Sequence, residues 1–262
     1  GLNAVKNVET VELTGAAAVT VALGSAVGSL SNTAITKLVF NTDDAGIDVV
    51  NSADTAHTYA FGAANTGAAT LNLATGVTTV NVALEGAGVV GALTVTPLAS
   101  DLVATPALVS TVNIASSGLA TAGANAIASV AAQAGSTINV TGSKALTIGA
   151  LTNKATVDAS AFTGNLVITG SAGADKIILG AGADTVNTGS TYATTDTITN
   201  FTKADTLVLT ASTVGAAADL VKYDASNSLS LEAALVAADA SAALGKAAYF
   251  VFGGDTYVVA NI

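Results

Sequence analysis

Several residue types that commonly build protein sites are missing from this chain of 262 residues. It has no cysteine, which excludes disulfide bonds and thiolate metal sites. It has no tryptophan and few other aromatic residues, which leaves little for stacking on sugars or for hot spots at protein interfaces. It also lacks methionine and begins with Gly1, so we expect it to be part of a longer protein.

Basic residues are scarce as well. Eight lysines and no arginine stand against 18 acidic residues, which gives a net charge of −10. This balance argues against binding nucleic acid, because phosphates require basic patches. It favours cations as partners, and most of the acidic residues are aspartate, the shorter carboxylate common in calcium-binding turns.

Long apolar runs and catalytic motifs are absent too. No stretch approaches about 18 unbroken apolar residues, which argues against a membrane-spanning helix. The single histidine, His57, lies near Asp54, but no nucleophile motif, zinc motif or phosphate-binding loop accompanies them. We therefore predict that the chain is not an enzyme.

One acidic turn, residues 41–48, contains Asp43, Asp44 and Asp48. These carboxylates could hold a calcium ion, yet their spacing does not match an EF-hand loop, which needs acidic residues at alternating positions and a terminal Glu. A solvated acidic turn is the favoured alternative.

Short segments of alternating apolar and polar residues begin near the N-terminus and end at Gly, Asn, Asp or Ser. Their regular spacing predicts a β-sandwich or a solenoid. The predicted strands lie within residues 8–15, 18–25, 35–42, 57–62, 70–76 and 78–86.

A repeat of nine to ten residues follows in the second half of the chain. Strand-like clusters begin at Thr137, Leu146, Thr156, Leu166, Lys176 and Thr185. Two strands per turn would make a coil of about 18–20 residues, as in a parallel β-solenoid built from nonapeptides. We expect these aliphatic side chains to form its core: Ile138, Val140, Leu146, Ile148, Val157, Val167, Ile177 and Val186.

Residues 170–190 contain two aspartates nine positions apart, Asp175 and Asp184. Each closes a glycine-rich turn and is followed two positions later by a branched aliphatic residue, close to the repeat G-G-x-G-x-D-x-U-x. Such turns expose backbone carbonyls and need glycine where φ is positive or where backbones approach closely. Stacked turns of this kind can surround Ca²⁺ with oxygen ligands. Ordinary Gly-Ala-Asp turns between hairpin strands are the alternative.

These two repeats resemble the calcium-binding β-roll of the repeats-in-toxin (RTX) proteins, which Gram-negative bacteria secrete by the type I pathway. The resemblance covers residues 137–262, with its motifs from Gly170 onward. Residues 196–212 are similar to the segment that closes such rolls, although Asn200 stands where Asp is usual. It implies that folding is coupled to calcium binding outside the cell. The predicted calcium site comprises Gly170, Ala172, Gly173, Asp175, Gly180, Ala181, Gly182, Asp184 and Asp196.

Two helices and a hairpin complete the predicted elements. Residues 119–134 are rich in alanine and predict a short helix inserted among the strands. Residues 228–243 predict an amphipathic helix with Ser228 or Ser230 as N-cap and Glu232 in its first turn. Residues 247–252 and 256–260, joined by Gly253, Gly254 and Asp255, predict a hairpin similar to the cap of RTX domains.

The fold class we expect is therefore all-β: a parallel β-solenoid or β-roll with calcium turns, minor helices and a C-terminal hairpin cap. Both prolines, Pro97 and Pro106, lie in a loop-like segment and suggest a boundary between residues 1–100, a strand-rich lattice domain, and residues 101–262, the β-roll with its cap.

The composition, rich in Ala, Thr, Gly and Val and free of Cys, is similar to that of bacterial surface-layer (S-layer) proteins and giant adhesins. We therefore expect a calcium-dependent structural protein at the cell surface, which forms a two-dimensional lattice with identical subunits. Attachment to a cell-surface polysaccharide would use another part of the full-length protein, and no nucleic acid is involved. The alternatives are a repeat adhesin, or the secretion and folding domain of a type I-exported enzyme.

Overall fold

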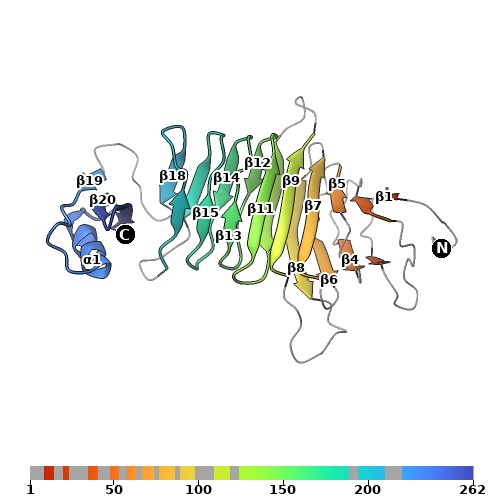
Figure 1. Cartoon of the computed structure of the whole chain (residues 1–262), viewed down its shortest axis with the longest axis horizontal. Coiled ribbons are helices and arrows are strands. Elements are labelled where there is room, and N and C mark those ends of the chain that lie inside the picture. The colour runs from red at the N-terminus through yellow and green to blue at the C-terminus, as the bar shows by residue number, and fades with distance from the viewer. Residues whose placement is uncertain are drawn as a thin grey trace.

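The computed structural model is a β-solenoid followed by a small C-terminal unit (Figure 1). It describes residues 9–14, 20–23, 35–40, 48–52, 58–62, 67–73, 77–85, 89–97, 109–118, 124–188, 194–209 and 220–261. The all-β fold class and the parallel β-solenoid predicted from the repeat are both confirmed.

The solenoid consists of two parallel sheets of nine strands each, and the chain alternates between them. Sheet A contains β1 (Thr10–Leu13), β3 (Lys37–Phe40), β5 (Thr58–Phe61), β7 (Thr79–Glu85), β9 (Thr111–Ser117), β11 (Thr137–Gly142), β13 (Thr156–Asp158), β15 (Lys176–Ile178) and β17 (Thr197–Thr199). Sheet B contains β2 (Thr20–Leu23), β4 (Asp48–Ser52), β6 (Ala69–Leu73), β8 (Val89–Pro97), β10 (Asn125–Ala131), β12 (Leu146–Ile148), β14 (Leu166–Thr169), β16 (Thr185–Thr188) and β18 (Thr206–Leu209).

Each strand pairs with the strand one coil away, and the pairing register gives the length of the coil. Thr156 of β13 pairs with Lys176 of β15, 20 positions further on. In sheet B, Val167 pairs with Thr185, 18 positions further on. The N-terminal coils are longer, because Thr79 pairs with Thr111. The nine-to-ten-residue repeat therefore describes the C-terminal coils, whereas longer connections between the N-terminal strands hide the same architecture.

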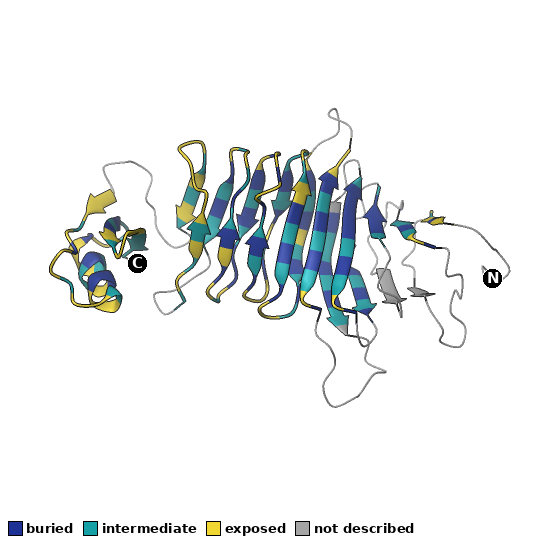
Figure 2. Ribbon diagram, viewed as in Figure 1, coloured by how far each residue is buried: buried dark blue, intermediate teal, exposed yellow. Residues whose placement is uncertain are grey.

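Because side chains alternate along a strand, every second residue of the short strands points into the solenoid (Figure 2). Seven of the eight predicted core residues are buried, including Ile177 and Val186 with no exposed surface. The prediction for Val167 is wrong: Leu166 and Ile168 on either side of it are fully buried, so Val167 lies on the outer face and is partly exposed. A period of two allows only one of two adjacent aliphatic residues to face inward.

The predicted helix at 119–134 is also wrong where the structure describes it. Residues 125–131 form strand β10, which pairs with β8 on one side and β12 on the other. Ile127 and Val130 are both buried, and their separation of three positions is what suggested a helical stripe. Pairing on both edges overrides the helical propensity of the alanine-rich segment.

The two sheets run without a break across residue 100. Strand β8, which ends at Pro97, pairs with β6 before this position and with β10 after it. Likewise β7 pairs with β9 in sheet A. The strands β4, β8 and β9, which the sequence analysis did not identify, are members of this continuous stack.

The C-terminal unit has its own sheet C, in the order β19 (Leu220–Lys222), β20 (Ala247–Phe252) and β21 (Asp255–Ala260). Helix α1 (Leu231–Ser241) packs on one face of this sheet. The predicted N-cap is confirmed, because the Ser230 hydroxyl accepts a hydrogen bond of 3.1 Å from the Ala233 N–H.

The predicted hairpin is confirmed as well. Gly253 and Gly254 have φ values of 64° and 98°, the left-handed pair that a tight hairpin turn requires.

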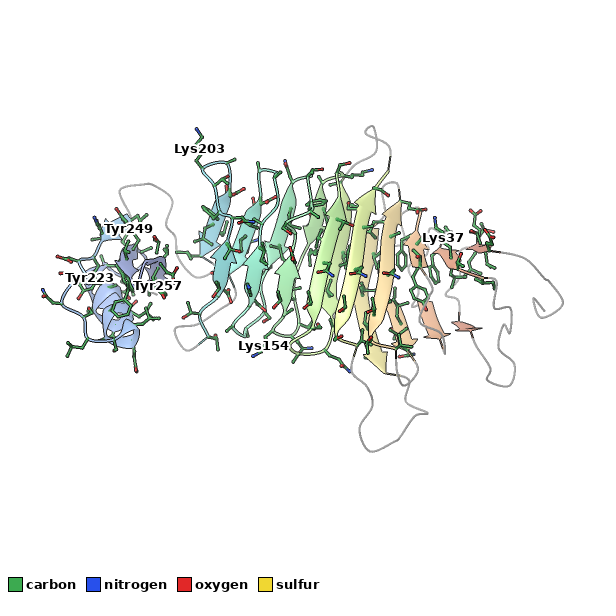
Figure 3. The ribbon with its side chains drawn as sticks, viewed as in Figure 1. Lys37, Lys154, Lys203, Tyr223, Tyr249 and Tyr257 are labelled. Carbon is green, nitrogen blue, oxygen red and sulfur yellow. The ribbon has the colours of Figure 1, made fainter. Side chains whose placement is uncertain are left out.

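Aromatic contacts hold this unit together. The ring of Phe250 stacks on Tyr257 with centroids 5.3 Å apart, and the ring of Tyr223 meets Phe250 edge-on at 6.1 Å. Figure 3 shows Tyr223, Tyr249 and Tyr257 gathered in this unit, beyond the last strands of the solenoid. Its buried residues form a cluster separate from the solenoid core.

We predict that Ile177→Ala lowers the free energy of unfolding by about 2–5 kcal/mol, because it leaves a cavity between Val157 and Ile198, with which Ile177 is in register. Val167→Ala, on the outer face, is the control and should cost about 1 kcal/mol or less. Urea denaturation followed by circular dichroism measures both variants. Equal losses would contradict the inward and outward assignments of these residues.

Candidate functional site

The predicted calcium turns form two corners of the solenoid, one for each sheet. Asp175 comes directly before β15 in sheet A, and Asp184 comes directly before β16 in sheet B. The two aspartates therefore do not stack on each other, contrary to our expectation from sequence. Both side chains lie inside the fold, with exposed fractions of 2% and 1%.

Asp175 fastens its own coil to the preceding one. Its Oδ1 atom accepts a hydrogen bond of 2.7 Å from the backbone N–H of Ala155, 20 residues earlier. Its Oδ2 atom accepts two more, from the N–H of Ser171 at 2.6 Å and from the Ser171 hydroxyl at 2.9 Å. Both carboxylate oxygens are thus engaged by protein donors.

Asp184 repeats this arrangement at the corner of sheet B. Its Oδ1 atom accepts a hydrogen bond of 2.8 Å from the N–H of Leu166 in the preceding coil. Its Oδ2 atom accepts a longer bond of 3.3 Å from the N–H of Gly180 in its own turn. One carboxylate again joins two coils and closes a turn.

The next coil continues both corners. Asp196 Oδ1 accepts a hydrogen bond of 3.0 Å from the N–H of Asp175, and Asp205 Oδ1 accepts one of 2.8 Å from the N–H of Asp184. Asp205 also closes its own turn, because its Oδ2 accepts from the Thr202 N–H at 2.7 Å and hydroxyl at 3.0 Å. We call Asp175, Asp184, Asp196 and Asp205 the corner aspartates.

The pKa values of the two carboxyl groups at the sheet B corner, Asp184 and Asp205, are shifted in opposite directions. Burial raises the pKa of Asp184, with a smaller contribution in the same direction from the nearby charge of Asp205. Partial burial also opposes ionisation of Asp205, but hydrogen bonds from Asp184 and Thr202 outweigh it and lower the pKa of Asp205. The inner carboxyl group is therefore the harder of the two to ionise.

The glycines of these turns serve close packing between coils. A Cβ atom on Gly180 would lie 2.2 Å from the carbonyl oxygen of Phe162, and one on Gly182 would lie 2.2 Å from that of Gly164. Neither has a positive φ, so close approach is the reason for glycine at both positions. Gly173 is similar, because its Cβ would meet Lys154 Cβ at 2.7 Å.

The remaining predicted site residues also take part in contacts between coils. The buried Gly170 donates its N–H to the carbonyl of Asn187, and the exposed Ala181 donates its N–H to the carbonyl of Phe162. The carbonyl of the exposed Ala172, a predicted calcium ligand, accepts a hydrogen bond of 3.0 Å from the Thr194 hydroxyl.

The predicted calcium ion stays a prediction, and the contacts of the corner carboxylates describe what surrounds it. A calcium site requires six to eight oxygen ligands directed at one point. At Asp175 the groups directed at the carboxylate are instead hydrogen-bond donors, the N–H groups of Ala155 and Ser171 and the Ser171 hydroxyl. Their positive ends favour the ionised form of the carboxylate. Within the described ranges, no three Asp, Glu or His side chains come together as a metal site.

Two members of the corners were missed at the sequence level. Asp205 has the same signal as the other three, an aspartate followed two positions later by a branched or long aliphatic residue, here Leu207. Ser171 replaces a glycine of the repeat, and its hydroxyl donates a hydrogen bond to the Asp175 carboxylate. That role depends on the fold of the turn, so the sequence carries no separate signal for it.

The other candidate site residues lie largely outside the described part of the chain. Asp43, Asp44, Asp54 and His57 are not described, and Asp48 is described only as the first backbone position of β4. The solvated acidic turn favoured for residues 41–48, and its alternative of a second calcium site, both stay untested.

We predict that Asp175→Ala destabilises the solenoid, because it leaves the Ala155 and Ser171 N–H groups buried without an acceptor. Each such donor costs about 1–3 kcal/mol. The matched control is Asp158→Ala, one coil earlier on the outer face, which should cost about 1 kcal/mol or less. Denaturant titration of the whole chain compares the two. A loss at Asp175 no larger than that at Asp158 would refute the fastening role.

We also predict that a chelator leaves the far-ultraviolet circular dichroism and the melting temperature of the whole chain unchanged, because the corner carboxylates already have protein donors. Melting curves in EDTA and in millimolar calcium chloride provide the measurement, with magnesium chloride as the control for ionic strength. A melting temperature that rises several degrees with calcium but not with magnesium would contradict this expectation and support calcium binding at the predicted turns.

The described part of the chain contains no helix that is long and apolar enough to cross a membrane. Comparison with known proteins finds no matching family, no matching curated protein and no matching solved structure.

Proposed function

We propose that this chain is a structural protein of the surface-layer type, which associates with identical copies into a two-dimensional lattice outside the cell. The observation that carries the proposal is the continuous solenoid, in which two sheets of nine strands enclose one uninterrupted core. Such a rod presents two long, regular side faces, and repeating faces of this kind suit repeated contacts between copies.

The chemistry of the chain supports a structural role. Its coils are joined by backbone pairing, buried aliphatic side chains and the corner aspartates, contacts that hold a rod in shape along its length. A net charge of −10 keeps separate copies soluble until a specific face brings them together.

A second candidate is the secretion and folding domain of a type I-exported protein. The C-terminal unit supports it, because α1 and sheet C form a cluster of buried residues distinct from the solenoid core. A unit with its own core at the end of a chain can be recognised separately from the rod. In this candidate function the C-terminal unit directs export and the solenoid is part of the exported protein. It predicts no lattice.

Electron microscopy of the purified protein tests the lattice proposal. We expect two-dimensional sheets as the protein concentration is raised, both with calcium and with EDTA, because protein donors bond to each corner carboxylate. Sheets with calcium alone would place ions at the contacts between copies. Single particles under every condition would contradict the lattice and leave the secretion domain and a repeat adhesin as the remaining candidates.

A further inference from the structure

The outer face of sheet A carries two columns of repeated side chains. In β7, β9 and β11 the same pattern recurs in register, a threonine and an asparagine on either side of an inward aliphatic residue. We call these six residues the Thr–Asn face: Thr79, Thr111, Thr137, Asn81, Asn113 and Asn139. All six are partly exposed, and Figure 2 shows β7, β9 and β11 with alternating buried and half-buried bands.

The asparagine column is held in one conformation. Asn113 Nδ2 donates a hydrogen bond of 2.8 Å to Asn81 Oδ1, and Asn139 Nδ2 donates one of 2.8 Å to Asn113 Oδ1. These bonds fix the amides along the sheet, while the β-branched threonines beside them have few rotamers. A preorganised face loses little side-chain entropy when another surface covers it.

We propose that the Thr–Asn face is the contact surface for a second copy of this chain, an inference that rests on the proposed lattice and names its contact face. The columns repeat at the strand spacing of about 4.8 Å. A second copy carries the same columns at the same spacing, so the two faces match along their whole length. In-register ladders of identical side chains, asparagine ladders among them, pack face to face in this way in steric zippers.

Charge supports the same partner. In a chain of net charge −10, the Thr–Asn face and the alanines beside it, Ala83 and Ala115, carry no charge, so two copies can approach there without repulsion. Glu85 at the end of β7 is neutralised by Lys37, whose Nζ lies 2.7 Å from its carboxylate.

Next to this face, the outer positions of β13 and β15 carry opposite charges, Asp158 and Lys176. The two charges are of opposite sign, so these strands add no net repulsion between two copies.

The size of the sheet is sufficient for a specific contact. The Thr–Asn face spans three strands, so the contact extends over the neighbouring strands of sheet A. All nine strands at about 4.8 Å spacing, each about five residues long, make a face of roughly 650 Å². Two such faces cover about 1,300 Å² together, within the range of specific protein interfaces.

The outer face of sheet B lacks this regularity and provides the control. The outward positions in register there are Ala126, Thr147, Val167, Thr185 and Thr206, in which an alanine and a valine interrupt the threonines. Thr147 and Thr185 are threonines on short strands with the same partial exposure as Thr111 and Thr137. A lysine at both positions of either pair adds the same charge at partly exposed strand positions.

The test compares Thr111→Lys/Thr137→Lys with Thr147→Lys/Thr185→Lys in the whole chain by sedimentation velocity over a range of concentrations. We expect the first variant to associate at least tenfold more weakly than the unaltered chain, and the second to associate like it. Melting curves followed by circular dichroism check that both variants fold. Association of the first variant equal to that of the unaltered chain would overturn the Thr–Asn face.

A second measurement does not depend on adding charge. Because the chain has no cysteine, Thr137→Cys and Thr147→Cys each introduce a single thiol. A short bis-maleimide should join two copies through residue 137 and fail to do so through residue 147. Dimers through residue 147 alone would place the contact on sheet B and overturn the proposed face, even if a lysine variant failed to fold.

The two proposals fail in different ways. If the unaltered chain and the Thr111→Lys/Thr137→Lys variant both form sheets in the electron microscope, the lattice proposal stands and the Thr–Asn face is not its contact surface. If the unaltered chain stays monomeric at every concentration, both the lattice and the face are wrong.

Discussion

Parallel pairing between strands one coil apart is the constraint on which this structure depends. A three-residue strand such as β15 has no stability alone, and its backbone groups find partners only in β13 and β17. Because the chain alternates between two sheets, every coil must have a compatible length and register at once. Aliphatic side chains such as Ile177 then stack in one continuous core.

The same pairing leaves some backbone N–H groups at the corners without a strand partner, and the corner aspartates bind these groups. Where the chain leaves one sheet for the other, a backbone N–H such as that of Ala155 or Leu166 is buried with no strand partner. A carboxylate from the next coil supplies the acceptor. Glycine at positions 180 and 182 allows the coils to approach closely enough for these bonds. The turns whose sequence is similar to calcium turns therefore also join successive coils by hydrogen bonds.

Pairing in register also decides what the outside of the solenoid presents. Each outward residue lies beside its counterpart from the next coil, so a sequence pattern that recurs, such as Thr-Val-Asn at 79–81 and 111–113, becomes a column. The Asn81, Asn113 and Asn139 amides then bond to one another. A regular exterior is thus a consequence of a regular core, and it links the fold to the proposed assembly.

Much of the fold could be predicted from the sequence, because hydrophobic period, turn residues and helix caps are local. They determined the parallel solenoid from residue 137, helix α1 with its cap at Ser230, and the C-terminal hairpin. Only the tertiary structure decided that residues 125–131 form a strand, since the partners that stabilise β10 lie far away in the sequence. It also decided the role of Asp175, whose partner at Ala155 depends on how two coils align, a relation that no local pattern encodes.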